Sequence, residues 1–164
     1  MALEFIHIRR INLLVIFFKA YNYNIKNGGG KYMRLAVNDP SHTYYLYDAT
    51  DKRAVEEQIT QFNPQFGKSI ITWESRVGIK TTEGGHQSPA TCLEHEFYHA
   101  VDNTNSPSER RAKSAEDGTP YESKGEKEAI EAENDTAKKN GEDVRKNHYG
   151  TTYETISPTS TKRK

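Results

Sequence analysis

Cysteine is almost absent from this chain, which carries only Cys92. A single cysteine excludes an internal disulfide framework and any zinc site built from four cysteines. A metal ion bound by this protein would therefore be held by histidine and carboxylate side chains.

An excess of charge of either sign is also lacking, because 23 Lys and Arg residues balance 23 Asp and Glu residues. This balance gives no support for a bulk electrostatic partner, so we expect neither nucleic acid nor an anionic membrane surface among the partners. The chain has 164 residues, of which 34% are hydrophobic and 28% charged, and this composition predicts one domain with a modest core and polar extensions.

Long hydrophobic runs are missing too. The most apolar stretch, Ile11–Phe18, is too short to cross a bilayer, so we expect no stable membrane span. It follows Arg9 and Arg10, which is the order found in a signal peptide, but Lys19 closes it and a good cleavage site does not follow. The stretch is either an export signal or, as we favour, a buried strand or short helix.

Three regions of different composition divide the chain. Residues 1–30 combine the apolar stretch with a flexible glycine-rich break, residues 31–155 form the expected folded domain, and residues 156–164 read as a disordered basic tail.

Within the domain, two strands are predicted at Lys31–Val37 and Thr43–Tyr47, followed by a helix over 52–62. A hairpin is then predicted from Ser69–Glu74 and Gly78–Thr81. We expect a free edge of this hairpin, beside the following helix, to pair with an extended substrate.

The residues 88–102 predict the central helix of the protein. Ser88 is a good N-cap, and Pro89 suits the first helical position, where no N–H is needed. At helical spacing the side chains divide into an apolar face and a polar face. The apolar face carries Ala90, Leu93, Phe97, Ala100 and Val101, and the polar face carries Cys92, His95, His99 and Asp102.

This helix contains an H-E-x-x-H motif at residues 95–99. His95 and His99 lie one turn apart and can direct two imidazole nitrogens at one Zn²⁺, while Glu96 can reach a water in the open position. The alternative is a helix with two incidental histidines.

Residues 103–125 contain almost nothing apolar except Tyr121, and we expect a mobile loop there. The loop is either a lid over the site or simply disordered surface, and the second interpretation is favoured.

A second helix is predicted over 126–140, and its inward face suggests the remaining ligand. Glu126 and Glu133 lie on the same face of this helix as its apolar residues, whereas Glu128 and Glu131 lie towards solvent. A carboxylate on an inward face must be paired or bound to metal, because burying it alone is costly. The alternative is a weakly amphipathic surface helix with incidental glutamates.

From about Ile70 onward the chain resembles the metallopeptidase-type toxin domains at the C-termini of bacterial Rhs-repeat polymorphic toxins, which are akin to the NleD-type effector zinc metallopeptidases. The matching residues are Ile71-Thr72-Trp73, Ser88-Pro89-Ala90, Leu93, His95-Glu96, His99-Ala100, Asp102, Glu126, Ala129, Glu133-Asn134, Gly141 and Tyr149-Gly150. Ala137 stands where an Arg is often found, and Arg145 lies one residue farther from Tyr149 than the pattern has it.

The resemblance implies an α+β fold, with a short antiparallel sheet whose edge strand lies beside the H-E-x-x-H helix and a second ligand-bearing helix. It implies Zn²⁺ held by His95, His99 and Glu126, with Glu96 as catalytic base. It also implies a protein or peptide substrate, a cognate immunity protein as partner, and a protein that is secreted or delivered into a target cell; otherwise we expect a cytoplasmic one.

The chemistry expected from these residues is metal-assisted hydrolysis of a peptide bond. Zn²⁺ would lower the pKa of its water to about 7, and Glu96 would accept the proton. Tyr149 and His148 are candidate donors to the oxyanion. Two rival interpretations remain: a zinc-stabilised binding module without catalysis, and a secreted or membrane-associated interaction protein that acts through its N-terminal apolar run.

The carboxylates of Asp102 and Glu133 are candidates to orient His99 and His95 respectively, although either could equally be a capping or surface group. Cys92 lies on the site side of the helix, but a lone helical cysteine is more often a small packing residue.

Overall fold

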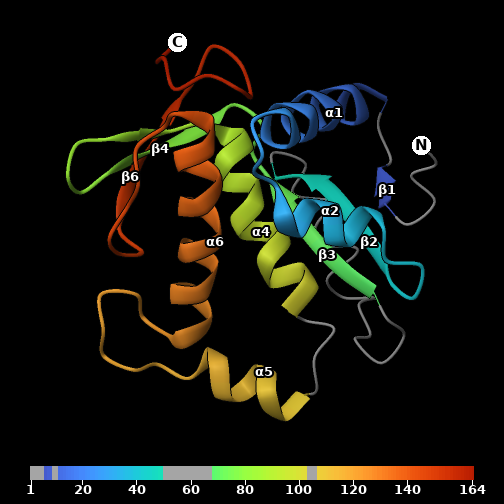
Figure 1. Ribbon diagram of the computed structural model, residues 1–164, viewed down its shortest axis with the longest axis vertical. Coiled ribbons are helices and arrows are strands. Elements are labelled where there is room, and N and C mark those ends of the chain that lie inside the picture. The colour runs from blue at the N-terminus through green and yellow to red at the C-terminus, as the bar shows by residue number, and fades with distance from the viewer. Residues whose placement is uncertain (1–5, 9–10, 50–67, 103–106) are drawn as a thin grey trace.

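The computed structural model describes residues 6–8, 11–49, 68–102 and 107–164, and within these ranges the chain forms five helices and two short sheets (Figure 1). The helices are α1 (Ile11–Lys26), α2 (Lys31–Val37), α4 (Pro89–Asp102), α5 (Pro107–Ser114) and α6 (Lys124–Asn140). The strands are β1 (Ile6–Ile8), β2 (Thr43–Asp48), β3 (Lys68–Trp73), β4 (Val77–Thr81), β5 (His86–Gln87) and β6 (Gly150–Glu154). The protein is a small α+β domain, as the sequence predicts.

The first sheet is parallel and has the strand order β1-β2-β3. Ile71 and Trp73, two residues apart on β3, are buried, and the Trp73 indole donates to the carbonyl of Pro89 at 2.9 Å. The predicted hairpin between β3 and β4 is therefore wrong. The two strands belong to different sheets, because the apolar side of β3 packs against α4 and its backbone pairs with β2.

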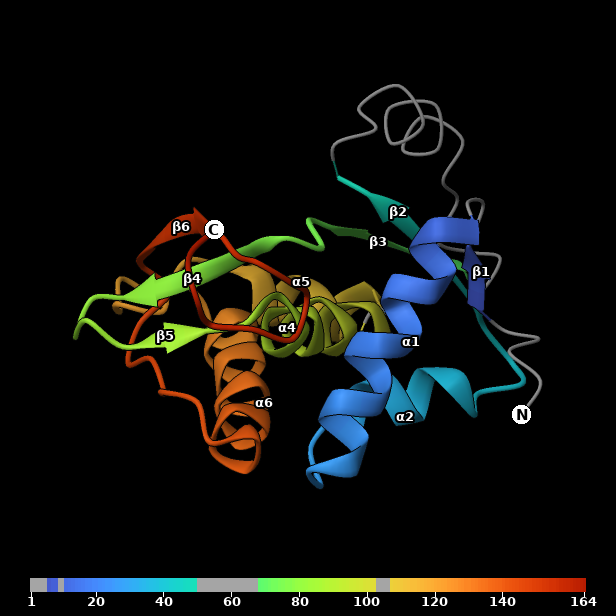
Figure 2. The same ribbon diagram turned by 90° about the horizontal axis from the view of Figure 1, so that it is seen from above.

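The second sheet is antiparallel, with the order β5-β4-β6, and β4 lies between its two neighbours. Figure 2 shows the two sheets extending to opposite sides of α4, joined by the short link between β3 and β4. This arrangement brings a strand from the end of the chain beside the strands that precede α4.

Helix α4 is the centre of the packing and contacts α1, α2, α6 and β3 (Figure 1). Its apolar face joins the core as expected, since Ala90, Leu93, Phe97 and Ala100 are all buried. Phe97 meets Phe17 of α1 with 6.0 Å between the ring centroids.

The segment Lys31–Val37 forms helix α2, so its prediction as a strand is wrong. Gly30 opens the helix in a left-handed conformation, with φ of 67°. The buried carboxylate of Glu94 on α4 then accepts hydrogen bonds from the backbone N–H groups of Tyr32, at 2.7 Å, and Met33, at 3.2 Å. These donors have no partner within their own helix, and Glu94 supplies one.

The apolar stretch after Arg10 forms the first half of α1, one of whose faces is buried through Leu13, Phe17 and Ala20. Of the strand and the short helix considered for this stretch, the structure shows a helix. Among the described residues no helix is both long and apolar enough to cross a membrane.

Two segments expected to be unstructured make definite contacts. Within the predicted loop 103–125, residues 107–114 form α5, whose Lys113 contacts α4 and α6. Within the predicted tail 156–164, the carbonyl of Pro158 accepts a hydrogen bond from Ala90 N at 2.8 Å. The helix predicted over 52–62 lies outside the described residues.

Candidate metal centre

Helix α4 presents the H-E-x-x-H motif because its ends and its apolar face are fixed. The hydroxyl of Ser88 accepts a hydrogen bond from Thr91 N at 3.3 Å, as an N-cap does. With the apolar face in the core, His95 and His99 lie on the opposite face, towards α6. His95 is buried and His99 is half-buried.

Helix α6 brings the acidic residues to this face. Its N-cap is Ser123, which accepts from Glu126 N at 3.2 Å, and Gly141 ends the helix in a left-handed conformation. Glu126 therefore lies in the first turn and Glu133 two turns later. Ala129, Ile130 and Ala137 are buried with Glu133, so the helix phase deduced from the sequence is the one observed.

Three atoms of these helices form a nearly equilateral triangle. His95 Nε2 lies 3.1 Å from His99 Nε2 and 3.1 Å from Glu126 Oε2. The third edge, from His99 Nε2 to Glu126 Oε2, is 3.2 Å. Three atoms that can each donate a lone pair are therefore close enough together to bind one metal ion.

The size of this triangle suits a small divalent metal ion. Tetrahedral zinc with ligand distances of about 2.0–2.1 Å separates its ligands by about 3.3 Å. When His95 and His99 are neutral and carry their protons on Nδ1, all three atoms are acceptors facing one another, and a bound cation satisfies them together. The donor set of two imidazoles and one carboxylate is found in zinc sites and in sites of other divalent transition metals.

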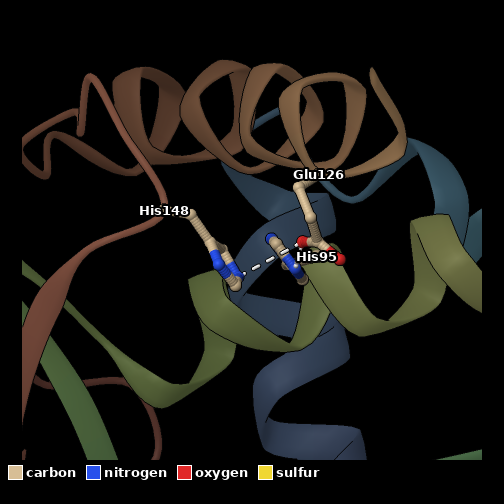
Figure 3. Close-up of side chains that lie close together, drawn as sticks. All are labelled: His95, Glu126 and His148. Atoms are coloured by element: carbon tan, nitrogen blue, oxygen red, sulfur yellow. Dashed lines mark ion pairs between the residues drawn. The ribbon is translucent and has the colours of Figure 1, made fainter. Parts of the chain in front are cut away.

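His148, on the segment between α6 and β6, adds a fourth donor to the cluster. Its Nε2 lies 3.2 Å from Glu126 Oε2, and its ring stacks on that of His95 (Figure 3). The ligand atoms of His95, Glu126 and His148 all lie within 4.8 Å of one another, so this group can hold a metal ion. His148 is held in place by Glu122, whose carboxylate lies 2.8 Å from Nδ1.

A buried ion pair lies behind His95. Glu133 Oε2 is 3.0 Å from His95 Nδ1 and 2.7 Å from an Nη atom of Arg145. The Asn134 side chain bonds both backbone groups of Arg145. Its Oδ1 accepts from the Arg145 N–H at 2.9 Å, and its Nδ2 donates to the Arg145 carbonyl at 2.7 Å. Glu133 and Asn134 thus fix His95 and Arg145 together.

The electrostatics of the cluster follow from these contacts. Burial opposes the charged form of His95, but hydrogen bonds to Glu126 and Glu133 outweigh it and raise the pKa of His95 to about 9. Hydrogen bonds from His95 and His99 hold the pKa of Glu126 far below its usual range. Glu126 is therefore ionised and available as a ligand at any pH near neutral.

A cleft of about 210 Å³ opens beside the cluster, and Glu96 and His95 line it together with residues of β4 and β6. Burial raises the pKa of Glu96, although the neighbouring His95 and His99 act in the opposite direction. A carboxylate whose pKa is raised towards neutrality is a better proton acceptor at pH 7 than a free one. Cys92 also lines the cleft, but burial raises the pKa of its thiol, which disfavours the thiolate that a metal requires.

The other residues singled out in the sequence lie around this centre. Asp102, expected near His99, forms an ion pair with Lys113 of α5 at 2.6 Å. Tyr149 is 52% exposed and lines a neighbouring cavity with Glu126, whereas its neighbour His148 is part of the cluster. Glu128 points away to Lys113 and Tyr98.

Arg145 is the residue whose position the sequence did not predict. It is 4% exposed and contacts both Glu133 and His95. The available signal was its place in the turn region after α6, near the Arg of the resembled pattern, but its one-residue offset from that pattern obscured it.

Comparison of the chain with protein-family models, with curated proteins and with solved structures finds no match.

Proposed function

We propose that this protein is a zinc-dependent metallopeptidase that hydrolyses peptide bonds of a protein substrate. The single observation that supports this most strongly is the triangle of His95 Nε2, His99 Nε2 and Glu126 Oε2, with edges of 3.1 to 3.2 Å, beside a cleft lined by Glu96. The same four residues match the ligands and base of the Rhs-type and NleD-type metallopeptidases that the sequence resembles.

In this proposal His95, His99 and Glu126 would hold the metal, which would supply Lewis acidity and lower the pKa of a water to about 7. Glu96 accepts the proton of the attacking water at its carboxylate. It then gives that proton to the leaving nitrogen, so that the peptide bond is replaced by a carboxyl group and an amine.

His148 is the better of the two candidates for stabilising the oxyanion. Its ring lies against His95, and the contacts of its Nδ1 to Glu122 and of its backbone N–H to Pro120 O, at 2.8 Å and 3.0 Å, hold it there. A donor fixed before the reaction costs no reorganisation when charge develops. Tyr149 is farther out on the rim and serves as the second candidate.

Glu133 and Arg145 act through His95. A carboxylate that accepts the Nδ1 proton fixes the tautomer in which Nε2 is free to bind metal. Arg145 pairs with Glu133 at a buried position, 2.7 Å away, and both are therefore positioning residues.

The proposal is tested with Glu96→Gln, compared with Glu83→Gln in the exposed turn between β4 and β5. Glu96→Gln should bind one equivalent of zinc and keep the wild-type unfolding temperature, while peptidase activity falls by on the order of 10²–10⁴-fold. Glu83→Gln should match the wild type in all three. Undiminished activity of Glu96→Gln, or a zinc-free wild-type protein, would reject the proposal.

A zinc-stabilised binding module without catalysis is the second candidate, and the position of His148 favours it. Structural zinc sites are closed by four protein ligands, and His148 Nε2 is only 3.2 Å from Glu126 Oε2. In a closed site, His148→Ala would release zinc with little effect on any enzyme activity. In the peptidase, the same variant should keep zinc and lose activity.

The resemblance to these toxin and effector domains also suggests a biological role. We infer a toxin or effector that is secreted or delivered into a target cell, with a cognate immunity protein that binds it. Co-purification of the protein with the product of a neighbouring gene would test the immunity partner.

A further inference from the structure

Within the residues that the structure describes, strand β4 has no free edge. β4 pairs with β5 on one side and with β6 on the other, so the hairpin that was expected to offer a free edge is not formed and β4 offers none. The edge strand beside the cleft is β6, which comes after both ligand-bearing helices. In the described part of the chain β6 has β4 as its only strand neighbour.

The direction of the backbone groups of β6 follows from the hydrogen bond between Thr155 and Arg76. Thr155 N donates to Arg76 O at 2.8 Å, and in this register residue 155 is opposite residue 76. Across an antiparallel pair, hydrogen-bonded and non-bonded residue pairs alternate. Thr151 and Tyr153 are therefore the residues that bond to β4, while Gly150 and Thr152 turn their N–H and C=O groups outward.

The opposite side of β4 gives the same phase independently. Thr81 N donates to Gly85 O at 2.8 Å, so Thr81 and, two residues earlier, Ile79 direct their backbone groups to β5. The intervening residues of β4, Gly78 and Lys80, then face β6. They are the partners of Tyr153 and Thr151 in the register.

The residues that carry these outward groups lie at the site. Gly150 and Thr152 line the same cleft of about 210 Å³ as His95 and Glu96. Both are exposed, and the far end of the edge is closed because Glu154 O accepts from Lys164 N at 3.0 Å. The open edge is thus limited to the part of β6 that is next to the metal centre.

We propose that the outward edge of β6 at Gly150 and Thr152 binds an extended peptide segment of the substrate as an added strand. This inference rests on the proposed function and names its substrate class. Main-chain hydrogen bonds give affinity in such pairing, whatever the side chains. The enzyme therefore selects disordered or unfolded segments and tolerates many sequences, because folded substrates have no free backbone to offer.

The first test replaces Thr152 with proline in the zinc-loaded protein. Thr152→Pro removes an outward N–H and leaves the bonds to β4 intact, as proline on an edge strand permits. It should keep the wild-type unfolding temperature and zinc content, while kcat/KM for a fluorescence-quenched disordered peptide falls at least about tenfold. The control Thr151→Pro should lower the unfolding temperature, because it removes a bond to β4. Wild-type kcat/KM in a folded Thr152→Pro protein would overturn the proposal.

The second test uses the wild-type strand in the zinc-loaded Glu96→Gln protein, so that hydrolysis is not needed. The probe is a capped tetrapeptide hydroxamate, compared with four copies that each carry one N-methylated amide. Amide hydrogen exchange of Gly150 and Thr152 should be fast in the free protein and at least about tenfold slower with the probe. Thr151 and Tyr153 should be protected in both states.

The outcomes separate the two proposals. At least one N-methylated copy should bind about five- to tenfold more weakly, because it cannot donate to β6. Equal affinity of all copies, or no protection of Gly150 and Thr152, would overturn the strand pairing while the metal site stands. Failure of acetohydroxamate itself to bind the zinc-loaded protein would reject the proposed function, and the strand pairing with it.

Discussion

Arg145 and Glu133 form an ion pair 2.7 Å long beneath the first histidine of the motif, and their side chains are 4% and 0% exposed. The pair contacts His95 from the side opposite to the metal ligands. Its integrity therefore matters to both the fold and the site.

Arg145→Met should destabilise the protein by about 3–5 kcal/mol, because it leaves the Glu133 carboxylate buried without a counter-ion. The double variant Arg145→Met/Glu133→Gln should recover a large part of this loss, since no charge is then buried. Denaturant unfolding of the metal-free proteins measures both. A double variant no more stable than Arg145→Met would show that the pair is not the cause.

The carboxylates of α6 should differ in their effect on zinc. Zinc affinity should fall by several kcal/mol for Glu126→Ala, which removes a ligand, but only about 10–100-fold for Glu133→Ala, which removes a positioning residue. Glu128→Ala should change it hardly at all, because Glu128 binds Lys113 at 2.7 Å on the other side of the helix. Competition with a zinc chelator gives these affinities. The largest loss for Glu128→Ala would mean that the ligand set is wrong.

The two histidines of the motif should be needed for metal as well. His95→Ala and His99→Ala should each reduce zinc to well below one equivalent, whereas His86→Ala on β5 serves as the matched control. Elemental analysis after gel filtration measures the content. Full occupancy in either site variant would contradict the proposed centre.

Helix α5 should depend on Lys113 for its attachment. Lys113 binds Asp102 at 2.6 Å and Glu128 at 2.7 Å, and these contacts raise the pKa of Lys113 above its usual value although burial opposes this. Lys113→Met should therefore make residues 107–123 more sensitive to subtilisin, at a cost of about 1 kcal/mol in overall stability. Lys127→Met, which removes only an exposed contact to Glu131, is the control. Equal cleavage of both variants would argue against the tether.

Glu94 should give the fold a measurable pH dependence. Burial raises the pKa of Glu94 to about 7 from its usual 4.5, although the N–H groups of α2 act in the opposite direction. A raised carboxyl pKa favours folding when the group is protonated, so its contribution is complete below pH 4.5 and is lost as the pH rises through about 7. Relative to Glu94→Gln, the wild type should lose up to about 3 kcal/mol across this range. A constant difference between the two unfolding free energies would contradict it.

The sequence predicts the parts of this fold that depend on local signals. Ser88 and Pro89 mark the start of α4, and the spacing of Leu93 and Phe97 sets its buried face. The positions of the two histidines on the opposite face are therefore predictable. Gly141 marks the end of α6 in the same way. The helix face indicates both Glu126 and Glu133, the resemblance to the metallopeptidases selects Glu126, and the structure places Glu126 Oε2 3.1 Å from His95 Nε2.

The rest depends on contacts between residues far apart in the chain. Tyr32 and Val37 favour a strand locally, but their segment is only seven residues long, and Glu94 on another helix stabilises it as α2. Strand pairing is equally non-local: nothing near Ile71 shows that β3 joins β2 in parallel. Helix α5 could not be predicted from the sequence because its attachment through Lys113 involves two other helices.

The position of Glu94 makes a prediction about the variation of related sequences. Two neighbouring residues of α4 serve different purposes: His95 faces the metal centre, and Glu94 caps α2 from the opposite side of the helix. Relatives that share this architecture should therefore show an acidic residue directly before the H-E-x-x-H motif together with a glycine at position 30. Where the acid is replaced, the segment before α2 should change with it, for example by gaining a Ser or Asp N-cap of its own. Covariation between these two distant positions would then identify the fold even in sequences whose overall similarity has been lost.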